Sequence, residues 1–187
     1  MTIPSPTCFV ATAMVTDLVT SAGAVWLSVR CQLNTDGRTE SSVVRLRNGV
    51  WTSAYVTEPS GGIVGLAEDG TGLVLAVGFR QVVGGSVPVL LAGRSTLREV
   101  ASFPTSQFFW AVAARAGAIY LVGQVPINDT PLVLRRNGST FVQESIDGDQ
   151  PLFGVTVDPA GTAWAVGPAF GGSFSPPRAG LWQRVTV

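Results

Sequence analysis

The stretch RAGAIYLVG (Arg115–Gly123) combines a glycine turn with a short strand of aromatic and aliphatic residues. Three other stretches of the chain follow the same pattern, namely SAGAVWLSV (Ser21–Val29), GTGLVLAVG (Gly70–Gly78) and PAGTAWAVG (Pro159–Gly167). Their first aligned glycines, Gly23, Gly72, Gly117 and Gly161, are 49, 45 and 44 residues apart. A nearly fixed period of this size predicts a repeat architecture.

A second anchor recurs in the same period. RNGVW (Arg47–Trp51), RNGSTF (Arg136–Phe141) and RAGLW (Arg178–Trp182) each place an arginine, a glycine turn and an aromatic residue in order, and GRSTL (Gly93–Leu97) is a degenerate copy. Asn-Gly is a strong hairpin signal because both residues tolerate positive φ. We therefore expect a hairpin between the third and fourth strands of each repeat.

The spacing leaves room for four short strands in each repeat, and no stretch shows helical periodicity. We predict an all-β fold, a β-propeller of four four-stranded repeats of about 45 residues each. The whole chain, 1–187, would be one propeller domain. The repeats would cover approximately 8–58, 59–104, 105–149 and 150–187.

The second strand of each repeat is apolar on both faces, as a strand between two neighbouring sheets should be. Aromatic residues in these strands, Trp26, Tyr120 and Trp164, would then wedge between blades. We expect the four repeats to close as one small ring. Pairing of two chains and an open array of stacked sheets are the alternatives.

These repeats resemble bacterial propeller repeats of the pattern GxxWxVG…RxxGxW, which are relatives of the Asp-box and photosystem-assembly-factor propellers. The resemblance covers nearly the whole chain and implies the fold. The segment Arg47–Trp51 keeps the glycine and the aromatic residue of an Asp-box without its Ser/Thr-x-Asp-x-Gly core. The resemblance therefore carries no activity onto these residues.

Composition removes several classes of function. The chain has 46% hydrophobic residues, a formal net charge of zero, no histidine and no lysine. Without a basic cluster we expect no nucleic-acid partner, and without histidine or lysine the commonest general base, metal ligand and Schiff-base amine are missing. We predict no cofactor and no metal.

The sequence also bears on location and on the two cysteines. No apolar run is long enough for a transmembrane helix, and the N-terminus lacks the positive segment of a signal peptide. We expect a soluble chain without membrane partners, either cytoplasmic or part of a particle such as a virion. Cys8 and Cys31 are expected as two unpaired thiols, with a disulfide between them as the alternative.

The loops that follow the second strands vary most between repeats, and in a propeller they lie at one end of the ring. Rigid scaffolds that present variable loops commonly bind ligands there. The candidate binding residues are Arg30, Arg80 and Gln124 at the strand ends, Asp36 and Asp129 in the loops, and Trp110 in the stretch QFFWAV. Core packing is the alternative interpretation of Trp110.

Acidic residues gather in the predicted turns. A pair of carboxylates could serve a glycoside hydrolase, although turn acids are ordinarily solvated or hydrogen-bonded to the turn. The oxygen-rich segment Asn34–Glu40 does not match a calcium-binding loop.

We predict a non-catalytic binding or structural module whose partner is another protein or a second copy of the chain. The first alternative is a lectin-like carbohydrate-binding propeller, and the second is an Asp/Glu-dependent glycoside hydrolase.

Overall fold

A computed structural model of the chain describes residues 13–32, 39–57, 60–115, 117–146, 148–169 and 178–183. The described residues form strands joined by turns and loops, without a helix. The first sheet contains β1 (Ala13–Ser21), β2 (Ala24–Gln32), β3 (Thr39–Arg47) and β4 (Val50–Val56). The second sheet contains β5 (Gly62–Glu68), β6 (Val74–Val82), β7 (Gly85–Gly93) and β8 (Arg98–Ser102). The third sheet contains β9 (Phe108–Arg115), β10 (Ala118–Val125), β11 (Thr130–Asn137) and β12 (Thr140–Gln143). The fourth sheet contains β13 (Gly154–Val157), β14 (Ala163–Ala169) and β15 (Arg178–Gln183).

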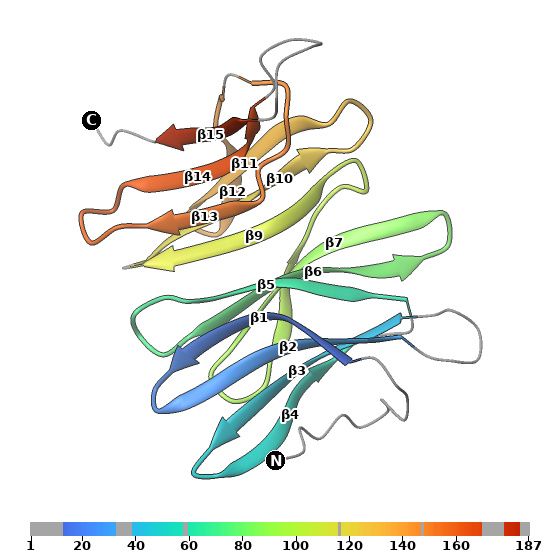
Figure 1. Ribbon diagram of the computed structural model, residues 1–187, viewed down its shortest axis with the longest axis vertical. Helices are drawn as coiled ribbons and strands as arrows, with labels where there is room; N and C mark the ends of the chain where they lie inside the picture. The colour runs from blue at the N-terminus through green and yellow to red at the C-terminus, as the bar shows by residue number, and fades with distance from the viewer. Residues whose placement is uncertain are drawn as a thin grey trace. The chain divides into compact units, whose positions relative to one another are not determined.

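Each sheet is antiparallel, with its strands hydrogen-bonded in chain order (Figure 1). In the described part of the chain three sheets have four strands and the fourth has three. Each predicted repeat contains one sheet. The all-β prediction is confirmed.

The chain divides into two compact units. The first unit, Met1–Thr105, holds the first and second sheets, and the second unit, Ser106–Val187, holds the third and fourth. Within each unit the first strands of the two sheets contact each other, β1 with β5 and β9 with β13.

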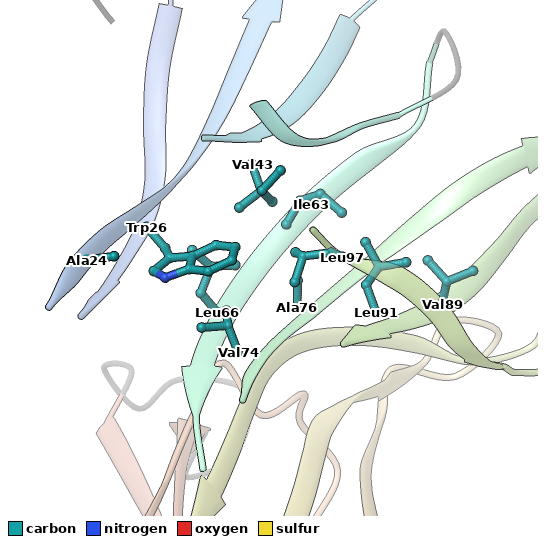
Figure 2. Packing of buried hydrophobic residues seen from close by; sticks show 11 residues of the cluster. Ala24, Trp26, Val43, Ile63, Leu66, Val74, Ala76, Val89, Leu91 and Leu97 are labelled. Atoms are coloured by element: carbon teal, nitrogen blue, oxygen red, sulfur yellow. The ribbon is translucent and has the colours of Figure 1, made fainter. Parts of the chain in front are cut away.

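The core of the first unit lies between its two sheets (Figure 2). Trp26 of β2 is almost fully buried and packs in one cluster with Val74 and Ala76 of β6. A smaller buried cluster on the other face of the first sheet contains Leu27 and Val29.

The second unit repeats this arrangement. Tyr120 of β10 is almost fully buried in one cluster with Ala163 and Ala165 of β14. In both units the aromatic residue of one sheet therefore packs against small second-strand residues of the following sheet. The predicted wedging of Trp26 and Tyr120 between sheets is confirmed, whereas the third predicted residue, Trp164 of β14, is only half-buried.

Turn chemistry explains where several strands end. Asn48 and Gly49 have φ values of 51° and 78°, as a two-residue hairpin turn requires. Gly138 has a φ of 61° in the β11–β12 turn. The hairpins predicted from these two Asn-Gly pairs are confirmed.

One other predicted turn is wrong, and one predicted loop is shorter than expected. Arg178–Trp182 is no hairpin, because it forms part of the single strand β15, in which Gly180 pairs with Gly167 of β14. Its Ala-Gly pair lacks the asparagine that stabilises positive φ in the other copies. Among the loops expected after the second strands, the one in the second repeat, Gln81–Ser86, is shorter than predicted, since β6 continues to Val82 and β7 begins at Gly85.

Cys31 is buried and disulfide-bonded, which overturns the expectation of unpaired thiols; Cys8 lies outside the described residues. Within the described ranges no helix could cross a membrane. The same residues contain no group of three or more potential metal ligands from histidine, cysteine, aspartate and glutamate.

Candidate binding site at the β10–β11 turn

The structure brings together three of the six predicted binding residues. Trp110, Gln124 and Asp129 are joined by hydrogen bonds in the second unit. Arg30 is exposed on β2 in the first unit, and Asp36 lies outside the described residues. Arg80 forms an ion pair with Glu99 of β8, with 3.3 Å between Nε and Oε2.

Trp110 is positioned by a β-bulge in the first strand of the third sheet. Its neighbours Phe109 and Ala111 pair with the adjacent residues Gly123 and Val122 of β10, so Trp110 is the extra residue. A bulge turns the extra side chain away from the regular alternation of a strand and often lies beside functional sites. Trp110 is consequently half-buried instead of continuing a core face.

At this bulge β9 approaches Gly123 closely. A Cβ atom at Gly123 would overlap the carbonyl oxygen of Phe108, and one at Gly78 would overlap that of Gly62 in the second sheet. In both sheets, therefore, the close approach of the first strand leaves no room for a side chain at the last glycine of the repeated stretch.

The same bulge recurs in the first unit. In β1 the extra residue is Thr16, and in β5 it is Val64. In the fourth sheet Phe153 precedes β13 and donates its N–H to the carbonyl of Val166 at 2.8 Å. Because the equivalent positions accept threonine and valine, the repeat does not itself require an aromatic residue at Trp110 or Phe153.

A chain of hydrogen bonds holds the indole ring. Nε1 of Trp110 donates to Oε1 of Gln124 at 3.1 Å, and Nε2 of Gln124 donates to Oδ1 of Asp129 at 2.8 Å. Asp129 adopts a φ of 54° in the turn, where Asn128 accepts a hydrogen bond from the Thr130 hydroxyl at 2.9 Å. The carboxylate therefore orients the Gln124 amide, which in turn orients the ring.

Two further aromatic rings contact Trp110. Its centroid lies 4.6 Å from that of Phe108 in a tilted arrangement and 5.4 Å from that of Phe153 in an edge-to-face arrangement. Phe153 is 50% exposed. Such ring pairs contribute about 0.5–1.5 kcal/mol beyond their buried area, so the cluster is a stable surface feature.

The second unit also has a small cavity, whose lining contains none of the three aromatic residues of this cluster. Its volume is about 150 Å³, and its lining includes Pro131, which pairs with Gln124, and Leu152, which precedes Phe153. Asp149, Gln150 and Trp182 add polar and aromatic atoms to the wall. The cavity is smaller than the roughly 300–1,000 Å³ of a typical ligand pocket, so it suits one small substituent of a larger ligand.

Several turn acids are already used by the fold. Oδ2 of Asp17 accepts the Leu66 N–H at 2.6 Å, which ties β1 to β5. Asp69 and Asp158 occupy equivalent turns, where their carboxylates accept the N–H groups of Thr71 and Thr162 at 2.8 Å and 2.9 Å.

These contacts shift two pKa values. Burial alone would raise the pKa of Asp69, but hydrogen bonds from Thr71 and Leu73 and the charge of Arg94 together lower it below its ordinary value. The pKa of Asp158 is also lowered, chiefly by the backbone hydrogen bond from Thr162. Both carboxylates are held ionised by turn amides, as turn chemistry predicts.

Sequence reasoning identified Trp110, Gln124 and Asp129 but missed Phe108 and Phe153. Phe108 belongs to the QFFWAV stretch, which already stood out because its Trp110 has no counterpart in the other repeats. Phe153 could have been found by comparing the residues before the first strands, once the bulge was known.

Comparisons with known proteins inform the fold alone. No protein-family model matches the chain, and no curated protein matches it. Among solved structures it is similar to the Hadza microbial sialidase Hz136, with 10% sequence identity and a TM-score of 0.55. The match covers 80% of this chain and 34% of that protein, so the chain spans about a third of its length.

Proposed function

We propose that this chain is a non-catalytic carbohydrate-binding module whose four sheets are the blades of a β-propeller. The sugar would stack on the aromatic cluster of Trp110, Phe108 and Phe153. The polar atoms of Gln124 and Asp129 would hydrogen-bond its hydroxyl groups.

One observation carries this proposal. Trp110 occupies a bulge position where the repeat also accepts Thr16 and Val64. Its ring contacts Phe153 and is held by the hydrogen bonds through Gln124 and Asp129. A rigid ring beside an oriented amide and a carboxylate supplies both an apolar platform and directed hydrogen bonds. Pyranose rings present the complementary surface, an apolar C–H face bordered by hydroxyl groups.

The propeller assignment rests on the repeats and on their packing. First strands contact each other within each unit, and the aromatic face of one sheet packs on the next. The likeness to a solved sialidase supports a propeller-type arrangement.

The non-catalytic assignment rests on what the candidate catalytic groups do in the fold. Sialidases use a tyrosine nucleophile. Here Tyr120 is almost fully buried in a core cluster, and Tyr55 packs against the core of the first unit. Asp17, Asp69 and Asp158 accept backbone hydrogen bonds, which makes them structural carboxylates.

A glycan array followed by calorimetric titration tests the function. We expect binding to a subset of glycans, and W110A should weaken it about thirtyfold or more, because truncating a central aromatic contact costs about 2 kcal/mol or more. V142A removes an exposed apolar side chain from β12 and should leave affinity unchanged. Circular dichroism confirms that each variant is folded. Binding to no glycan, or equal binding by W110A, would refute the proposal.

The protein-interaction role predicted first from the sequence would use a different surface, on the fourth sheet.

A further inference from the structure

Within each unit the second-strand aromatic residue of one sheet packs on the following sheet, and we call this arrangement the packing rule. It predicts what should cover the fourth sheet. Trp26 of the first sheet is covered by the second sheet, and Tyr120 of the third sheet is covered by the fourth. The equivalent residue of the fourth sheet is Trp164, which is only half-buried. Its face is thus the one that a further sheet of the same type would cover.

Exposure along this face supports that reading. Val166 pairs with Leu181 across the β14–β15 ladder, so both side chains share the face of Trp164. Val166 is 46% exposed and Leu181 is 65% exposed, whereas Val122, at the position of Val166 in the third sheet, is 0% exposed. The opposite face of β14 carries Ala163 and Ala165, both fully buried.

The first sheet carries the complementary face. Val25 and Leu27 occupy the positions of Ala163 and Ala165, the residues that receive an aromatic face in the second unit. In the β1–β2 ladder Leu18 pairs with Leu27, so it lies on the same face. Leu27 is already buried in the smaller cluster of the first sheet, whereas Leu18 is 56% exposed and Val25 is half-buried. By the packing rule, this face of the first sheet is the one that would receive a sheet face carrying an aromatic residue such as Trp164.

We propose that the Trp164–Val166–Leu181 face of one copy binds the accessible Leu18–Val25 part of the first-sheet face of a second copy of this chain. The contact continues the sheet-on-sheet interface already formed within each unit. Because the two faces differ, the association is head-to-tail, and it closes into a ring or extends into a filament according to the rotation between copies. The interface buries the exposed apolar side chains on both sheets.

Light scattering on a sizing column tests this inference with surface variants. We expect the wild-type chain to elute at a multiple of its 19.5 kDa mass. L181R damages one face and L18R damages the other, and each alone should give a 19.5 kDa species. Both side chains are exposed, so the monomers should stay folded. V142R places the same charge on β12 and should leave the assembly intact.

Mixing the two variants gives the sharpest result. L181R keeps an intact first-sheet face and L18R keeps an intact fourth-sheet face, so an equimolar mixture should form a species of twice the chain mass. A symmetric contact between like faces would give no such rescue.

A wild-type monomer at 19.5 kDa would overturn the proposal.

Discussion

The Gly123→Ala substitution tests the explanation of the bulge that positions Trp110. The new Cβ would overlap the carbonyl oxygen of Phe108, which is backbone, so no rotamer change relieves it. β9 must therefore move away from β10. Overpacking costs about 1–3 kcal/mol, and weakening about two ladder hydrogen bonds costs about 1 kcal/mol each. We expect a total loss of about 3–5 kcal/mol in the free energy of unfolding.

Calorimetric melting measures this loss, with Gly138→Ala as the matched control. A chain of this size loses about 2–4 °C in Tm for each kcal/mol, so G123A should lower Tm by roughly 6–20 °C. Gly138 has a φ of 61° in an open turn with no atom within 4 Å of an added Cβ. Left-handed strain alone should make G138A cost about 1–2 kcal/mol.

The first sheet shows how the reasoning could fail. There Val29 occupies the position of Gly123, and β1 still forms its bulge at Thr16. If β9 can shift outward as readily as β1 has done, G123A will melt no lower than G138A. That result would refute a steric role for Gly123. At temperatures where G123A is still folded, displacement of Phe108 and Trp110 should also weaken glycan binding.

Three other substitutions test separate contacts. Q124A removes the acceptor of the Trp110 N–H and should weaken glycan binding about tenfold, with little change in Tm, because one directed hydrogen bond is lost at a half-exposed site. D17A removes charge-assisted hydrogen bonds to Leu18 and Leu66 and should cost about 2–4 kcal/mol by denaturant titration, with D17N intermediate. In the D69N/D158N double variant, the free energy of unfolding should fall less steeply with decreasing pH than in the wild type. Both pKa values are depressed in the fold, so their contribution is present above about pH 4 and is lost as the pH falls through the folded pKa values.

The sequence predicted the sheets well because their anchors are local. Asn48-Gly49 and Gly138 form the expected turns, since Asn-Gly specifies its own backbone conformation. Arg178–Trp182 failed because arginine and an aromatic residue around one glycine do not specify a turn, and the segment gains more hydrogen bonds as β15. Local patterns are decisive only where the residues constrain φ.

The candidate site was only partly predictable because a bulge is a property of two strands. Gln124 and Asp129 were found from their place after a second strand. Core packing was the alternative for Trp110 because the sequence places it within an inner strand. The close approach of β9 to Gly123, which turns Trp110 out of that alternation, depends on the pairing register.

The bulge also explains how a repeated fold can carry a single site. The glycine and aromatic anchors recur because each sheet must pack on the next, and they leave little freedom for change. The extra residue of each bulge lies outside the paired ladder, so the packing that fixes Trp26 or Tyr120 does not constrain it. Thr16 and Val64 use this freedom without forming an aromatic surface, whereas the Trp110 ring lies 5.4 Å from that of Phe153 and is held by hydrogen bonds through Gln124 and Asp129. A binding surface can therefore evolve in one pair of sheets while the repeat that supports it stays unchanged.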